Sequence, residues 1–183
     1  VLYGGSAGGG KSYAMLADPL RFMGHPAFSG LLLRHTTEEL RELIFKSQEM
    51  YPKIWPGIKW SERKMQWTAP SGARLWMSYL DREDDVLRYQ GLAFSWIGFD
   101  ELTQWPTPFA WNYMRSRLRS TASDLPVYMR ATTNPGGRGH HWVKKMFIDP
   151  APHGKAFDAT DIETTEVLRY PAGHAKAGKP LFK

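Results

Sequence analysis

The sequence contains no cysteine among its 183 residues, so neither a disulfide framework nor a thiolate metal site is available. It also lacks an apolar run of the roughly 20 residues that a membrane-spanning helix needs, and it has no basic leader followed by a small-residue cleavage site. These absences indicate a soluble protein that is stabilised by packing. They permit a reducing compartment without requiring one.

The composition is that of an ordinary globular domain, with 42% hydrophobic and 23% charged residues. The 24 Lys+Arg outnumber the 18 Asp+Glu and give a net charge of +6. This surplus suits polyanions such as nucleotides or DNA, although it is also common in proteins without such partners. At this length we expect one α/β domain over residues 1–183.

Short apolar runs and helical patterns alternate along the chain. The apolar runs predict buried strands at residues 1–3, 31–33, 95–99 and 127–132. Helical patterns predict helices at residues 11–22, 37–51, 108–118 and 141–147, with a short one beginning in the charged stretch 81–89. Alternating apolar and polar residues on either side of a Pro-Ser-Gly turn predict an antiparallel hairpin at residues 64–67 and 74–77.

This order of elements predicts an α/β fold with a mainly parallel central sheet, helices on both faces and a β-hairpin insertion. In such folds, sites form at the carboxyl ends of the strands. Within the first helix, Tyr13, Met15 and Leu16 are available to face the sheet, and Thr36 or Thr37 can cap the second helix.

A glycine-rich segment between the first strand and the first helix matches the phosphate-loop pattern G-x-x-x-x-G-K-[ST]. Its residues are Gly5, Ser6, Ala7, Gly8, Gly9, Gly10, Lys11 and Ser12. Glycines let successive backbone N–H groups point at phosphate oxygens, and the following helix adds its positive dipole end. Lys11 can then reach the β- and γ-phosphates of ATP, with the Ser12 hydroxyl on Mg²⁺. The flanking strand and helix favour this interpretation over an ordinary Gly/Ser turn.

Two carboxylates, Asp100 and Glu101, directly follow the apolar run at residues 95–99. Alone, such a pair is more often a solvated turn. Beside a phosphate loop, Asp100 is expected to hold the water shell of Mg²⁺, and Glu101 to polarise an attacking water as general base. The pattern therefore predicts an ATPase in which Lys11 and Glu101 are catalytic.

Three segments in this order resemble the ATPase domain of the phage terminase large subunit: the phosphate loop, residues 95–101 and residues 131–135. The resemblance covers residues 1–148. It implies a P-loop NTPase fold and a motor that uses ATP and Mg²⁺ to drive viral double-stranded DNA into a procapsid. It also implies work in the host cell cytoplasm, with the portal protein, the small terminase subunit and neighbouring copies in a ring as partners.

The resemblance places Thr133 and Asn134 in a coupling motif that senses the γ-phosphate and links hydrolysis to movement. A hydroxyl or amide at a strand end can hydrogen-bond the attacking water or the γ-phosphate and lose that bond on hydrolysis, so Asn134 is also expected to act in catalysis. The other interpretation of this segment is a plain Asn-Pro turn.

Three arginines are candidates for contacts with the nucleotide. Arg88 precedes the carboxylate strand and is the candidate arginine finger, acting on the γ-phosphate bound by a neighbouring subunit; a solvated arginine is the alternative. Arg34, at the end of the second strand, is a candidate for contact with the nucleotide or with Glu101. Arg138 lies just after the coupling motif.

Parts of the family pattern are missing. The chain begins at Val1 without an initiator Met, and the adenine-contacting segment expected upstream is absent, so we interpret it as a fragment. No second domain with clustered acids follows, so nuclease activity is not expected. The acids Asp158, Asp161 and Glu163 are more simply explained as an exposed strand or loop than as a two-metal site.

Other interpretations fit the same motifs. A nucleotide-gated binding or regulatory module would bind ATP with negligible turnover, although the presence of Glu101 argues against it. A helicase-like motor would keep the ATPase activity and act on DNA differently. The eight tryptophans are scattered through strands and helices and are mostly expected in the core, and the adjacent His140 and His141 point apart and do not indicate a metal site.

Overall fold

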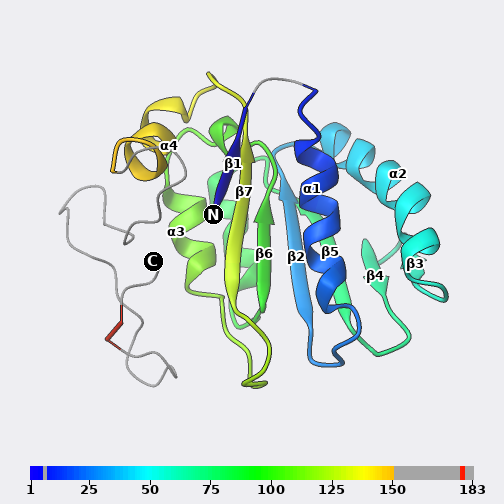
Figure 1. Cartoon of the computed structure of the whole chain (residues 1–183). Helices are drawn as coiled ribbons and strands as arrows, with labels where there is room; N and C mark the ends of the chain where they lie inside the picture. Colours follow the sequence, from blue (N-terminus) through cyan, green and yellow to red (C-terminus); the bar gives the residue numbers. More distant parts are fainter. Residues whose placement is uncertain (6–7, 151–177, 180–183) are drawn as a thin grey trace.

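A computed structural model describes residues 1–5, 8–150 and 178–179 of the chain. Its centre is a seven-stranded sheet in the order β1-β7-β6-β2-β5-β4-β3 (Figure 1). The strands are β1 (Leu2–Gly4), β2 (Ser29–Arg34), β3 (Lys59–Ser61), β4 (Gln66–Thr68), β5 (Arg74–Tyr79), β6 (Trp96–Phe99) and β7 (Tyr128–Thr133). From β1 to β5 in this order all neighbours are parallel, whereas β4 and β3 are antiparallel additions at one edge.

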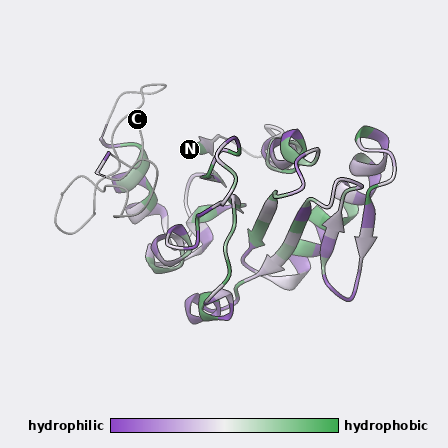
Figure 2. Ribbon diagram, turned by 90° about the horizontal axis from the view of Figure 1, so that it is seen from below, coloured by the Kyte–Doolittle hydropathy of each residue, from purple (hydrophilic) through white to green (hydrophobic). Residues whose placement is uncertain are grey.

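Helical segments lie on both sides of the sheet, as the view from below shows (Figure 2). One face carries α1 (Lys11–Ala17), the 3₁₀ helix η1 (Asp18–Phe22) and α2 (Thr37–Ile54). The other face carries η2 (Glu83–Tyr89), η3 (Leu102–Gln104), α3 (Phe109–Arg115) and α4 (His140–Phe147). Within the described ranges, no helix is long and apolar enough to cross a membrane.

The core is therefore two apolar layers separated by the sheet. Successive residues of a strand point to opposite faces, and β2 shows the consequence. Leu32 packs in the layer under α1 and α2, whereas Leu31 and Leu33 pack in the layer under α3 and α4, and all three are fully buried. A central strand buried on both faces is what a continuous run of leucines predicts.

The fold class predicted from the sequence is confirmed, and the hairpin is confirmed as β4 and β5. The hairpin is more than an insertion, because β5 also pairs in parallel with β2. The expected first helix is shorter than predicted: it changes to 3₁₀ geometry after Ala17, because Pro19 has no backbone N–H with which to continue the α-helical hydrogen bonds.

Tyr13 does not face the sheet, unlike Met15 and Leu16, which are buried. Its side chain is 52% exposed, because residues two apart on a helix do not share a face. The tryptophans follow the prediction: five are buried and the other three are half-buried. The buried ones are Trp67, Trp96, Trp105, Trp111 and Trp142.

A capping box starts α2. The Thr36 hydroxyl accepts a hydrogen bond from the Glu39 backbone N–H, and the Glu39 carboxylate accepts one from the Thr36 N–H, both at 3.3 Å. These contacts satisfy two donors that a helix start otherwise leaves unpaired. Thr36, one of the two predicted caps, therefore fixes where the helix begins.

A buried carboxylate fastens the far end of α1 to the sheet. Asp18 accepts hydrogen bonds of 2.8 Å from the Trp96 indole N–H and from the Tyr128 hydroxyl. It also pairs with Arg21 and Arg130, each at 2.6 Å. Four donors around one carboxylate compensate its burial. The helix that follows the phosphate loop is thereby held against β6 and β7.

Replacing Gly98 by alanine is expected to destabilise this packing. A Cβ at Gly98 would overlap the Trp96 ring, and it would lie 2.8 Å from the Met15 sulfur. Overpacking of this kind should lower the free energy of unfolding by about 1–3 kcal/mol, measured by urea denaturation. Gly4→Ala is the control, because its Cβ would make an ordinary 3.7 Å contact with Thr133. Equal stability of the two variants would contradict this account of β6.

Candidate active site

The strand order brings four separate segments of the sequence to one edge of the sheet. The pairings Gly4 with Thr133, Ala131 with Phe99, and Phe99 with Leu33 align the carboxyl ends of β1, β7, β6 and β2. The phosphate loop, the coupling motif and the carboxylate pair follow the first three of these strands, and Arg34 ends the fourth. Motifs that lie up to about 130 residues apart therefore meet at the edge where α/β folds bind ligands.

The phosphate loop leaves β1 and leads into α1. Gly8 and Gly10 have φ of 80° and 70°, a left-handed conformation in which a side chain would be strained. Lys11 is 8% exposed, and its Nζ donates to the Gly5 carbonyl at 3.2 Å. Ser6 and Ala7 lie outside the described residues. Gly10, which the motif requires, and Gly8, which it does not, thus both occupy backbone positions that favour glycine.

Asp100 directly follows β6 and is 1% exposed. One carboxylate oxygen faces the Ser12 hydroxyl at 3.5 Å, and the other accepts a short hydrogen bond from the Thr132 hydroxyl. Ser12 and Asp100 were predicted to serve the same metal ion, and the structure brings them together across the sheet edge. Hydroxyl and carboxylate oxygens at this separation are the donor types that Mg²⁺ prefers.

Glu101 has φ of 59° and ψ of 58°, which is unusual for a residue other than glycine. The conformation is held by surrounding contacts. Its N–H donates to the Thr132 hydroxyl at 3.0 Å, and its carboxylate accepts from the Asn134 amide at 3.1 Å and from the Gln104 amide at 2.8 Å. Strained residues of this kind occur where the surrounding structure determines a side-chain position.

Arg34 lies between the two carboxylates. It is 6% exposed, its Nε lies 3.3 Å from Asp100, and its Nη1 lies 3.1 Å from Glu101. A buried and a partly buried acid that are neighbours repel each other unless a cation compensates them, and Arg34 is that cation. Of the two roles considered for Arg34, support of Glu101 is the one that its position favours.

Sequence reasoning missed several residues of this network. Gln104 donates to both Glu101 and Glu39, at 2.8 Å and 2.7 Å, and so links α2 to the carboxylate pair. Burial alone would raise the pKa of Glu39, but the Gln104 hydrogen bond and nearby Arg34 outweigh it and lower that pKa. Thr132 was also missed, although it lies next to Thr133 in the coupling motif and its hydroxyl touches both acids.

The coupling motif is tied to the segment that follows Glu101. The Thr133 hydroxyl donates to the Thr103 hydroxyl at 3.0 Å, and the Thr103 hydroxyl in turn contacts the Asn134 carbonyl at 3.2 Å. Thr133 is 6% exposed and serves this internal contact. Asn134, in contrast, reaches Glu101, so only one of the two predicted coupling residues touches the carboxylate pair.

A cavity of about 250 Å³ lies between the phosphate loop and Glu101. Its walls come from the loop, from α1 and α2, and from the ends of β6 and β7. The lining residues are Gly8, Gly9, Gly10, Lys11, Ser12, Tyr13, Lys46, Glu101 and Asn134. The predicted loop, base and coupling amide therefore surround one space.

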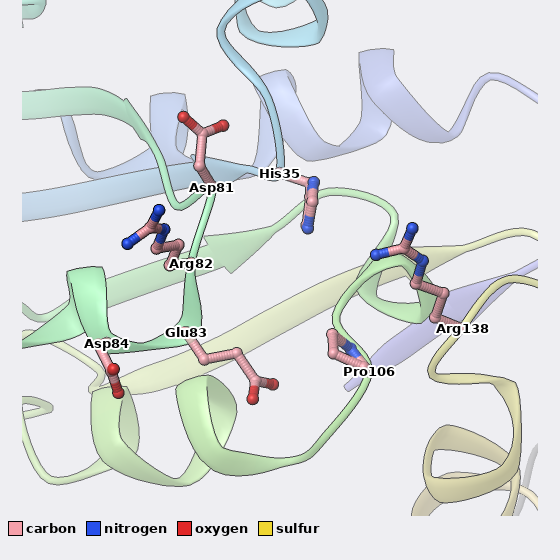
Figure 3. Close-up of a pocket in the computed structure, with 7 residues that line it drawn as sticks. All are labelled: His35, Asp81, Arg82, Glu83, Asp84, Pro106 and Arg138. Atoms are coloured by element: carbon pink, nitrogen blue, oxygen red, sulfur yellow. The ribbon is translucent and has the colours of Figure 1, made fainter.

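Arg88 and Arg138 lie away from this cavity. Arg88 is half-exposed and donates to the Tyr79 carbonyl at 2.8 Å. Arg138 lines a second cavity, of about 310 Å³, where its guanidinium points toward His35 (Figure 3). Of these two cavities, only the smaller one is lined by the glycine-rich loop. Asp158, Asp161 and Glu163 fall outside the described residues.

Comparison with protein families decides the relationship. The sequence model of the terminase large subunit, T4likevirus-type, N-terminal family matches residues 2–169. The chain belongs to this terminase family. A search of curated proteins gives no match.

Solved structures agree with the fold of this terminase domain. The large terminase from a thermophilic bacteriophage superposes with a TM-score of 0.64 and 20% identity over 81% of this chain and 37% of the other. The same protein in complex with ADP superposes with a TM-score of 0.59 and 20% identity, over 81% of this chain and 36% of the other. The N-terminal domain of the DNA packaging ATPase from bacteriophage phi29 superposes with a TM-score of 0.54 and 18% identity, over 72% of this chain and 71% of the other. The chain thus spans 37% of the length of the first of these.

Removing Arg34 is expected to leave the buried Asp100 and the partly buried Glu101 without a counter-ion. Arg34→Ala should lower the free energy of unfolding of this terminase domain by about 3–5 kcal/mol at neutral pH, measured by thermal or urea denaturation. The exposed Arg41 of α2 supplies the control, since Arg41→Ala should stay within about 0.5 kcal/mol. In a protein that also carries Glu101→Gln, Arg34→Ala should lower the free energy of unfolding by less, because only Asp100 is then left without its counter-ion. A loss no larger than that of the control would show that the ion pairs contribute little.

Proposed function

We propose that this terminase domain binds ATP with Mg²⁺ in the cavity beside the phosphate loop and hydrolyses it to drive viral double-stranded DNA into a procapsid. The observation that carries the proposal is the convergence of Lys11, Ser12 and Glu101 around one space, with Asp100 next to the Ser12 hydroxyl. Membership in the terminase family and the ADP complex of a related large terminase support it.

The residues of the phosphate site suit a triphosphate. The backbone N–H groups of the loop and the start of α1 bind phosphate oxygens, and Lys11 moves from the Gly5 carbonyl to the β- and γ-phosphates. Ser12 and Asp100 would hold Mg²⁺, directly or through water, and the open backbone at Gly8 and Gly10 leaves room beside them. When bound, Mg²⁺ neutralises charge that develops on the phosphate oxygens.

Glu101 acts as the general base. Its carboxylate accepts a proton from the water that attacks the γ-phosphate, the bond from the γ-phosphorus to the bridging oxygen breaks, and ADP leaves. Arg34 and Gln104 hold the carboxylate in place from the side of β2 and α2. A base fixed by two donors needs little rearrangement when the water arrives.

Asn134 connects the nucleotide to movement. Its amide donates to Glu101 at 3.1 Å and also lines the cavity, so a γ-phosphate competes with Glu101 for the same N–H group. Hydrolysis and phosphate release return the amide to Glu101. Because Thr103 and Thr133 tie this loop to η3, the exchange moves the segment that follows the carboxylate pair.

The whole motor requires partners. We assign to it double-stranded DNA, the portal protein, the small terminase subunit and further copies of the chain in a ring on the portal, in the host cell cytoplasm. Arg88 acts from one subunit on the γ-phosphate held by its neighbour. Its half-exposed position, away from its own phosphate cavity, suits action between subunits.

Two substitutions separate binding from hydrolysis. Lys11→Ala should abolish tight ATP binding, whereas Glu101→Gln should keep binding and lower the Mg²⁺-dependent hydrolysis rate by about 10²–10⁴-fold. Both are compared with the parent chain by a phosphate-release assay, with and without double-stranded DNA. Glu49→Gln, at an exposed acid of α2, is the control and should leave the rate unchanged. Tight binding without turnover, even when the longer protein is assembled on its portal, would favour a nucleotide-gated module instead.

Arg88 is tested by mixing subunits of the assembled motor. Arg88→Ala should lower hydrolysis by about 10³-fold or more without weakening ATP binding. Mixing it with Glu101→Gln subunits should restore part of the rate, because some interfaces then pair an intact Arg88 with an intact Glu101. The control is Arg63→Ala, an exposed arginine between β3 and β4. No recovery in the mixture would rule out action between subunits.

A further inference from the structure

The phosphate cavity has a second cationic wall, which comes from α2. Lys46 lines the same space as the phosphate loop, Ser12 and Glu101. It comes from the third turn of an 18-residue helix and lies outside every motif that the sequence displays. We propose that Lys46 is a γ-phosphate contact that makes this site prefer ATP to ADP, an inference that rests on the proposed function.

The packing of α2 against α1 places Lys46 beside Ser12. The Tyr51 hydroxyl donates to the Leu16 carbonyl at 2.9 Å, and one turn further along, the Trp55 indole donates to the Leu20 carbonyl at 3.0 Å. The two segments therefore run side by side in register. Toward the start of both helices, Lys46 of α2 and Ser12 of α1 line the same cavity.

The strand order puts Lys46 on the γ-phosphate side of the cavity. α2 follows β2, and β2 pairs with β6, the strand that ends in Asp100 and Glu101. The phosphate loop starts at β1, beyond β7 on the other side of β6, and crosses to α1, which packs beside α2. A phosphate chain that starts at the loop and ends at the base Glu101 therefore ends toward α2.

The side chain of Lys46 can make this contact. It is 36% exposed, and its ion pair with Glu42, one turn earlier, has an Nζ to Oε2 distance of 3.9 Å. An exposed pair at that distance contributes little, so moving the ammonium to a phosphate loses little. Of the charged side chains that line the cavity, Lys11 and Lys46 are cationic, and the one anion, Glu101, is already paired with Arg34.

A second lysine also fits the chemistry of this particular loop. All side chains of the described loop residues before Lys11 are hydrogen atoms, because Gly5, Gly8, Gly9 and Gly10 are glycines. Lys11 and Mg²⁺ leave a fully ionised triphosphate with net negative charge. Lysine binds phosphate as a mobile point charge, which suits a residue that reaches in from a neighbouring helix.

The test compares dissociation constants for Mg²⁺-ADP and for a non-hydrolysable Mg²⁺-ATP analogue, measured by calorimetry. Lys46→Gln should raise the dissociation constant for the ATP analogue by about 10-fold or more, as expected for loss of one charge-assisted hydrogen bond. It should change the dissociation constant for ADP by less than about 3-fold. Lys46→Arg should restore most of the preference. Lys53→Gln, an exposed lysine on the same helix, is the matched control and should change neither constant.

The outcomes distinguish this inference from the proposed function. An equal loss for both nucleotides, or no loss for either, would overturn the γ-phosphate contact, and so would a loss of DNA affinity alone. If Lys11→Ala abolishes binding while Lys46→Gln leaves the ADP-to-ATP ratio unchanged, the nucleotide site stands and only the role of Lys46 fails. A parent chain that binds neither nucleotide would overturn both.

Discussion

The parallel pairing of β7 with β1 on one side and with β6 on the other is the constraint on which the site depends. It sets the phosphate loop and the carboxylate pair two strands apart, with the coupling loop between them. Thr132, on the intervening strand, then touches Asp100 and the backbone of Glu101 at once. A shift of one residue in either pairing would turn these side chains to the other face of the sheet.

The charges at this edge balance locally. Asp100 and Glu101 are adjacent and mostly buried, and Arg34 comes from the next strand to lie against both. The carboxylate of Glu101 also accepts hydrogen bonds from the side-chain amides of Gln104 and Asn134. Because Gln104 also contacts Glu39 of α2, the position of Glu101 depends on α2 and on the coupling motif together. A carboxylate that many groups orient changes position with any of them. This arrangement suits the base and coupling roles that we propose for Glu101 and Asn134.

Features encoded in short stretches could be predicted from the sequence. The phosphate loop, the acids after an apolar run, the buried leucines of β2 and the Thr36 cap depend on neighbours in the chain, and the structure has them as expected in place and geometry. Contacts that depend on strand order could not be derived in this way. Three arginines were candidates for contact with the nucleotide, and only the pairing of β2 with β6 places Arg34 against the carboxylates. No pattern in the sequence indicated that Gln104 would contact Glu101. Which residues perform the chemistry remains a prediction.

The buried carboxylate at the end of α1 limits what can move during a cycle. Sliding or tilting this helix would separate Asp18 from the Trp96 indole, the Tyr128 hydroxyl and the Arg130 guanidinium, and would leave a buried carboxylate with too few donors. The helix and the central strands therefore form one rigid frame. In the proposed cycle, displacement would fall on the loops after β6 and β7, which are hydrogen-bonded to each other and would move together.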